Sequence, residues 1–135
     1  MALEGRQHLI KRVLIVDDDP DVTLTLKMGL NHYHDDGNTR FEVYSYNDPA
    51  SALTEFKPNF YDLIITDVYM LGMNGLELSQ RVMELEPNIK VCLMSGAEIN
   101  IDALSEVYPN VSFDCFIKKP VTINMLIKRL LVDLN

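Results

Sequence analysis

The sequence lacks the features that mark several large classes of protein. Its 135 residues contain no repeat, no low-complexity segment and no linker rich in Pro, Gly or Ser, which argues against a string of small domains. No apolar run approaches the roughly 20 residues that span a bilayer. The opening MALEGRQHLIKR carries Glu4 and Arg6 where a secretory signal has its apolar segment. We therefore expect one cytoplasmic domain that does not enter a membrane.

Cysteine, histidine and basic residues are also scarce. Cys92 and Cys115 lie in apolar runs without a CxxC pattern, and three histidines are too few to complete a zinc site with them. We expect both cysteines to be buried and reduced. Twelve basic against twenty acidic residues give a net charge of −8, with no basic cluster larger than a pair. This balance argues against direct binding to nucleic acid.

What the sequence does contain is an alternation of short apolar runs with longer periodic ones. A hydrophobic fraction of 47% with 24% charged residues is typical of a globular domain with one core. The short runs are bounded by Asp, Asn, Gly or Pro and predict five strands, each followed by a helix. The predicted strands are residues 12–16, 41–46, 63–66, 89–94 and 113–117. Such a repeat predicts a parallel sheet with helices on both faces.

The predicted helices differ in clarity. Apolar residues recur at helical spacing over residues 123–134, and Thr122 is placed to cap that helix. Asp48 and the proline after it open another helix. Over residues 22–30 the apolar residues alternate, which is typical of a strand. The Asp19-Pro20 start and the need for a crossover favour a helix there.

Polar residues follow the carboxyl ends of four predicted strands. Asp17 and Asp18 follow the first strand, Asp67 the third, Ser95 the fourth and Lys119 the fifth. These ends share one edge of a parallel sheet, which is where ligands bind in such folds. Converging carboxylates repel one another unless a cation neutralises them, and oxygen ligands alone favour Mg²⁺. The set suits phosphoryl transfer to a carboxylate, whereas the absence of a histidine at a strand end excludes an acyl-transfer triad.

Four motifs in this order resemble the response-regulator receiver domain of two-component signalling. They are VLIVDDDP at the first strand, LIITDVYMLGMNGLEL around the third, VCLMSGA at the fourth and FIKKP at the fifth. The resemblance covers essentially the whole chain. It implies an α/β fold of the flavodoxin-like class, with a single doubly wound sheet of five parallel strands in the order 2-1-3-4-5 and five helices. The receiver domain would span residues 11–135, after an N-terminal extension of residues 1–10.

The resemblance also implies the roles of individual residues. Asp67 would be the phosphoacceptor, and Ser95 and Lys119 would contact the phosphoryl group. The Mg²⁺ ligands would be Asp17, Asp18, Asp67 and the backbone carbonyl of Tyr69. Ser95 and Phe116 would form the switch. The Lys119-Pro120 peptide looks like the family's cis peptide. Leu71 departs from the pattern, because the family usually has proline there, and the polar stretch 32–40 is longer than usual.

The implied partners follow from the same resemblance. A histidine kinase or phosphotransfer protein would supply the phosphoryl group, and the chain would have no enzymatic activity beyond its own phosphorylation and dephosphorylation. The sequence stops directly after the fifth predicted helix, so we expect output through a downstream protein or through self-association. The face formed by the fourth helix, fifth strand and fifth helix would carry that contact. A fragment of a longer regulator or kinase would have the same sequence.

Two other functions fit parts of the sequence. The stretch from Asp19 to Thr23 spells DxDxT, the motif of a haloacid-dehalogenase-type phosphatase, but Asp19 lies two residues beyond the position that such a nucleophile needs. No acidic pair near the fifth strand completes that site. The other alternative is a pseudo-receiver that binds partners without phosphorylation, and the intact Asp67, Ser95 and Lys119 argue against it.

Overall fold

Strands and helices alternate along the whole described chain. The computed structural model describes residues 9–35 and 39–134, and within them five strands alternate with five helices. In chain order these are β1 (Leu9–Val16), α1 (Pro20–Asn31), β2 (Thr39–Tyr46), α2 (Pro49–Thr54), β3 (Leu63–Asp67), α3 (Gly75–Leu85), β4 (Lys90–Ser95), α4 (Ile101–Val107), β5 (Phe116–Lys118) and α5 (Ile123–Asp133). The predicted strand–helix pairs are confirmed.

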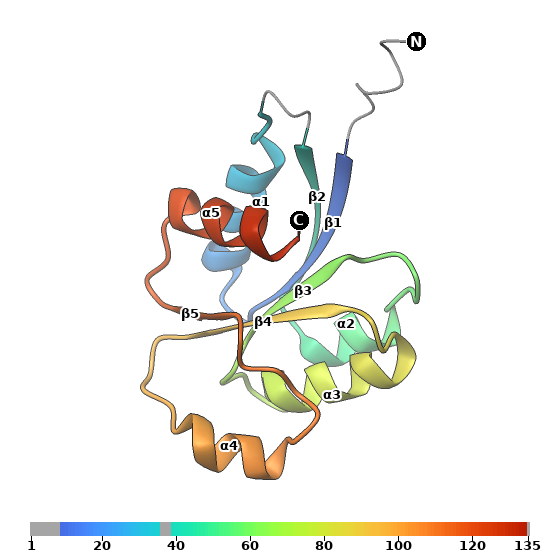
Figure 1. Cartoon of the computed structure of the whole chain (residues 1–135), viewed down its shortest axis with the longest axis vertical. Helices are drawn as coiled ribbons and strands as arrows, with labels where there is room; N and C mark the ends of the chain where they lie inside the picture. The colour runs from blue at the N-terminus through green and yellow to red at the C-terminus, as the bar shows by residue number, and fades with distance from the viewer. Residues whose placement is uncertain (1–8, 36–38, 135) are drawn as a thin grey trace.

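The five strands form one parallel sheet. Their order is β2-β1-β3-β4-β5, as the receiver resemblance implied. Helices α1 and α5 cover one face of the sheet, and α2 and α3 cover the other (Figure 1). Because both faces are covered, residues 13–16 of β1 and all of β3 are buried, which explains why these strands are continuous apolar runs.

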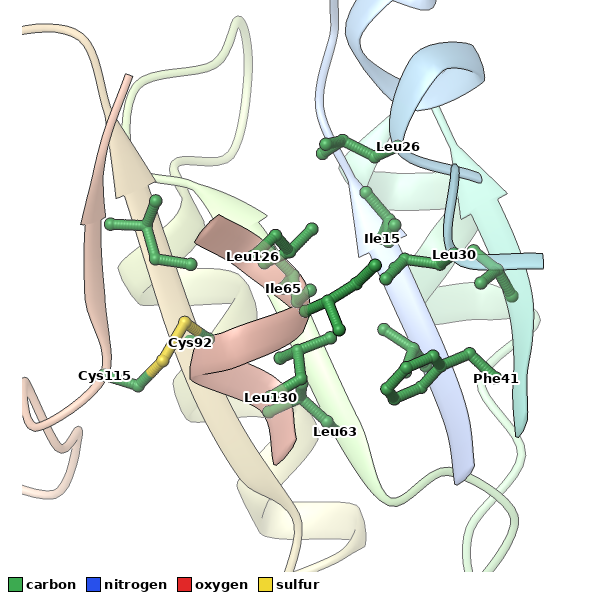
Figure 2. Close-up of a cluster of buried hydrophobic side chains, with 14 of the residues drawn as sticks. Ile15, Leu26, Leu30, Phe41, Leu63, Ile65, Cys92, Cys115, Leu126 and Leu130 are labelled. Carbon is green, nitrogen blue, oxygen red and sulfur yellow. A yellow bond between two sulfur atoms is a disulfide. The ribbon is translucent and has the colours of Figure 1, made fainter. Parts of the chain in front are cut away.

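Each face of the sheet has its own hydrophobic cluster. On one face, Leu26 and Leu30 of α1 and Leu126 and Leu130 of α5 pack towards the sheet, as Figure 2 shows. The other cluster joins side chains of α2 and α3 to the sheet, with Leu104 of α4 at its margin. Each fully buried leucine contributes about 1.5–3 kcal/mol relative to an exposed one. The two layers therefore hold the sheet rigid beneath the site described below.

Local capping sets the start of the helices as predicted. The side chains of Asp19, Asp48 and Thr122 accept hydrogen bonds from backbone N–H groups in the first turns of α1, α2 and α5. The ambiguous segment 22–30 is helical. Its apolar residues alternate because α1 is apolar beyond its buried stripe, with Leu24 and Met28 exposed.

Four of the five strands begin at positions other than those predicted, and the largest differences, three residues each, are in β1 and β5. Strand β1 begins at Leu9, three residues before the predicted start, because the exposed apolar residues Leu9 and Ile10 pair with Thr39 and Arg40 at the start of β2. Strand β5 begins at Phe116, three residues later than predicted. Its ladder to β4 starts with the pair Leu93 and Phe116, and the residues before it approach β4 without forming strand pairs.

The expected state of the cysteines is wrong in one respect. Cys92 and Cys115 are buried, as predicted, but a disulfide joins them, and their Cα atoms are 4.7 Å apart (Figure 2). The physical reason is strand register. Leu93 donates its backbone N–H to the carbonyl of Cys115, which places the two cysteines side by side on β4 and the approach to β5. No helix in residues 9–35 or 39–134 has the length and apolar character that crossing a membrane requires.

Candidate functional site

The candidate site lies at the carboxyl ends of β1, β3, β4 and β5. Asp17 directly follows β1, Asp67 and Ser95 are the last residues of β3 and β4, and Lys119 directly follows β5. Asp17, Asp67 and Ser95 are all buried. The sheet therefore places these side chains where the topology predicted them.

Lys119 joins two of the carboxylates. Its Nζ lies 2.6 Å from Asp17 Oδ2 and 3.1 Å from Asp67 Oδ2, within hydrogen-bond distance of both. Asp17 comes 102 residues before Lys119 in the chain. Charge-assisted hydrogen bonds of this kind are about twice as strong as neutral ones. Lys119 therefore ties β1, β3 and β5 together at the edge of the sheet.

Burial and the hydrogen bond between the two groups have opposite effects on the pKa values of Asp67 and Lys119. Burial raises the pKa of Asp67, the hydrogen bond and charge of Lys119 offset only part of that rise, and the nearby charges of Asp17 and Asp18 add to it. Burial alone would lower the pKa of Lys119, but its hydrogen bonds to Asp17 and Asp67 raise that pKa above its ordinary value. Lys119 therefore remains a cation, and one cation does not fully compensate the three carboxylates.

The acidic side chains form a compact set of oxygen ligands. Asp17, Asp18 and Asp67 each place a carboxylate oxygen within 4.8 Å of the others. Two loop amides hold the first two: Asp19 N donates to Asp17 Oδ1 at 2.9 Å, and Leu71 N donates to Asp18 Oδ2 at 3.3 Å. Hard oxygen donors without histidine or thiolate are the ligands that Mg²⁺ prefers, so the residues present fit that ion.

Ser95 and Phe116 are engaged away from the carboxylates. The Ser95 hydroxyl donates to the carbonyl of Ala97 and accepts from the backbone N–H of Ala97, at 3.0 and 3.1 Å. Its backbone carbonyl accepts from Lys119 N at 2.9 Å, so Ser95 is linked to Lys119 through the main chain. Phe116 is half-buried against the α2–α3 cluster, whereas the side chain of Tyr69 is exposed.

The remaining predicted features have clear positions. The Lys119-Pro120 peptide is cis, which confirms the expectation from the resemblance. Asp19 caps α1, because its carboxylate accepts from the backbone N–H of Asp21 at 3.0 Å. Its exposed place on the cap is not the position directly after a strand that a DxDxT nucleophile needs.

Two residues that support the site had no role assigned to them from the sequence. Asn47 donates from Nδ2 to the carbonyl of Asp17 at 2.9 Å and to Thr23 Oγ1 at 2.8 Å, which ties the end of β1 to α1. Its signal was available, since Asn47 is the polar residue directly after the second predicted strand. Gly75 packs its backbone against Asp67: a Cβ atom there would lie 1.9 Å from the Asp67 carbonyl oxygen. Nothing in the local pattern marks that close approach.

Comparison with known proteins finds relatives that match most of this chain. The chain is 34% identical over 116 residues to the autoinducer 1 sensor kinase/phosphatase LuxN of Vibrio campbellii, covering 84% of this chain and 12% of LuxN. It is 31% identical over 120 residues to the regulatory protein VanRB of Enterococcus faecalis, covering 87% of this chain and 50% of VanRB. The chain thus spans half or less of the length of these two relatives.

The fold has close counterparts among solved structures. The non-phosphorylated HemR receiver domain of Leptospira biflexa superposes with a TM-score of 0.76 at 22% identity, covering 93% of this chain and 94% of that one. The family model of the response regulator receiver domain matches residues 13–131, which include every strand end of the candidate site. The chain therefore belongs to the response regulator receiver domain family.

Proposed function

We propose that this receiver domain accepts a phosphoryl group on Asp67 in a Mg²⁺-dependent reaction and thereby switches a binding surface. The observation that carries the proposal is the position of Lys119 Nζ, 3.1 Å from Asp67 Oδ2 and 2.6 Å from Asp17 Oδ2. A cation held against the nucleophile is placed to neutralise the charge that builds up on a transferring phosphoryl group.

The reaction is an in-line displacement at phosphorus. A carboxylate oxygen of Asp67 forms the new bond to phosphorus while the bond between phosphorus and the donor's leaving group breaks, and the product is an acyl phosphate. The donor would be a phosphorylated histidine of a kinase or phosphotransfer protein. Similarity to part of a sensor kinase/phosphatase and to part of a regulatory protein supports this donor class.

The acidic cluster would hold the metal. Carboxylate oxygens of Asp17, Asp18 and Asp67, together with the backbone carbonyl of Tyr69, are the proposed ligands, and the spacing of the carboxylates supports this set. Bound Mg²⁺ would supply positive charge to the phosphoryl oxygens. Leu71 N and Asp19 N orient the carboxylates of Asp18 and Asp17 before any ion arrives.

The switch would connect Ser95 to Phe116. On phosphorylation the Ser95 hydroxyl would leave Ala97 and donate to the phosphoryl group, and Phe116 would turn inward. The α4–β5–α5 face would then change its partner binding or self-association. Exposed apolar side chains on both helices support a protein contact there, among them Val107, which is 65% exposed, and Val132, which is 74% exposed.

Phosphorylation with a small phosphodonor tests the proposal. With Mg²⁺ and acetyl phosphate, intact-mass spectrometry should find one added phosphoryl group on the wild type and none on Asp67→Asn. With Mg²⁺ and beryllofluoride, which mimics a phosphoryl group, NMR amide shifts around Phe116 should appear in the wild type and be absent from Asp67→Asn.

A matched control removes a carboxylate elsewhere. Asp102→Asn changes an exposed aspartate on α4 and should accept phosphate at the wild-type rate. Equal labelling of the wild type and Asp67→Asn would refute Asp67 as the acceptor. Lack of labelling in all three proteins, with a phosphorylated histidine donor as well as acetyl phosphate, would favour the pseudo-receiver.

A further inference from the structure

The disulfide lies between the two strands that carry Ser95 and Lys119. Cys92 precedes Ser95 by three residues on β4, and Cys115 precedes Lys119 by four residues on the segment that becomes β5. Both side chains belong to the cluster under α5, as Figure 2 shows. The covalent bond therefore lies within the layer that positions the site, on the two segments that lead to Ser95 and Lys119.

Strand β5 depends on that bond more than an inner strand would. It has three residues and lies at the edge of the sheet, so within the described chain β4 is the strand that it pairs with. Three register pairs, beginning with Leu93 and Phe116, hold the two strands together. The disulfide adds a covalent link directly before the first of these pairs. Opening it would leave no covalent link between β5 and β4, which would then be joined by this short ladder and two flanking hydrogen bonds, from Leu93 N to the Cys115 carbonyl and from Lys119 N to the Ser95 carbonyl.

The disulfide borders a pocket at the end of the sheet opposite the acidic cluster. A pocket of about 340 Å³ lies where β3 and β4 begin, and Cys115 lines it together with Leu63, Lys90 and Asp133. Cys115 is 6% exposed, whereas Cys92 is fully buried. Cys115 is therefore the side from which a small thiol would approach the disulfide, away from the phosphoacceptor site.

We propose that Cys92 and Cys115 form a reversible thiol–disulfide switch that sets how firmly β5 holds Lys119 at the phosphoacceptor site. The inference rests on the proposed function of Asp67 and adds redox control to it. In the disulfide state, β5 is fixed to β4 and Lys119 is held beside Asp67. In the dithiol state, β5 is less constrained, so Lys119 is less well placed when phosphoryl transfer begins.

The chemistry is thiol–disulfide exchange with a dithiol reductant. A thiolate of the reductant attacks the sulfur of Cys115, the bond between the two protein sulfurs breaks, and Cys92 leaves as a thiolate that takes up a proton. The second thiol of the reductant then attacks the mixed disulfide and releases Cys115. The protein gains two electrons and two protons, and the dithiol becomes a disulfide.

The test compares the two redox forms of the full wild-type chain. Native protein is reduced with dithiothreitol without denaturant, quenched in acid and freed of the reductant, and its thiols are then alkylated in denaturant; intact mass should show two alkylated cysteines. Oxidised dithiothreitol should close the bond again. We expect the amide signals of Phe116 and Lys119 to shift on reduction, and acetyl phosphate labelling of Asp67 to slow by roughly three-fold or more, because a catalytic group loses its fixed position.

A variant without the pair separates the switch from other effects of the reductant. Cys92→Ala/Cys115→Ala should label at one rate with or without dithiothreitol. Two results would overturn the switch: no free thiols after reduction of the native protein, or free thiols with unchanged amide signals and an unchanged labelling rate. A protein purified with free thiols that oxidised dithiothreitol cannot close would also overturn it. If neither redox form is phosphorylated on Asp67, the result counts against the proposed function. The number of free thiols and the amide shifts on reduction would still test the switch.

Discussion

Gly75 offers a sharp test of how the β3–α3 loop is held. It is the first residue of α3, and its backbone N–H donates to the carbonyl of Val68 at 2.8 Å. A Cβ atom at Gly75 would lie 1.9 Å from the carbonyl oxygen of Asp67 and 3.0 Å from Thr66 Oγ1. The nearest obstacle is backbone, which cannot rotate away as a side chain can. Gly75→Ala must therefore move α3 away from the end of β3.

The expected magnitude follows from two opposing effects. Alanine is favoured over glycine in a helix by up to about 1 kcal/mol, so the change would stabilise the protein if there were space. Overpacking against well-packed neighbours typically costs about 1–3 kcal/mol. Because the contact must open by about 1 Å against backbone, we expect the upper part of that range and a net loss of about 2 kcal/mol in the free energy of unfolding.

Urea unfolding measures that loss, and Gly96→Ala is the matched control. The nearest atom to a Cβ at Gly96 is Lys119 Cβ at 3.8 Å, an ordinary contact, so this variant should stay within about 0.5 kcal/mol of the wild type. Labelling with acetyl phosphate gives a second readout, because a misplacement of about 1 Å can slow a reaction about 100-fold. Gly75→Ala with wild-type stability and labelling would refute the close packing of α3 against Asp67.

Two further predictions concern Asp18 and Tyr61. Leu71→Pro removes the N–H that donates to Asp18 at 3.3 Å, so calorimetry should find Mg²⁺ affinity weaker by about five-fold, as for a loss of about 1 kcal/mol. Leu71→Ala keeps the N–H and should bind Mg²⁺ like the wild type. Equal Mg²⁺ affinity in both variants would count against this role of the Leu71 N–H. Burial, followed by the charges of Tyr46 and Tyr44, raises the pKa of Tyr61 to about 12, so the unfolded chain loses this proton first, near pH 10. The free energy of unfolding should therefore fall between about pH 10 and 12 by an amount on the order of 2 kcal/mol. Urea titrations should show a smaller fall for Tyr61→Phe. An identical fall in the wild type and Tyr61→Phe would contradict the effect of burial on Tyr61.

Much of the fold could be predicted because its determinants are local. Capping by Asp19, Asp48 and Thr122 involves residues two or three positions away, and the helix starts were predicted from those residues alone. The strands were recognisable because burial on both faces demands continuous apolar runs. The beginning of β5 was not predictable in this way, since it depends on where Phe116 first pairs with Leu93 of β4.

In the candidate site, too, the identity of the residues could be predicted from the sequence, whereas their contacts could not. By itself the sequence determined which polar groups follow the strands, because the carboxyl ends of parallel strands share one edge. Only the tertiary structure decided that Lys119 lies between Asp17 and Asp67, that the N–H of Leu71 meets Asp18, and that Cys92 and Cys115 are bonded. Those contacts join segments far apart in the chain. Their distances are set by the register and packing of whole strands and helices, which no short stretch of sequence encodes.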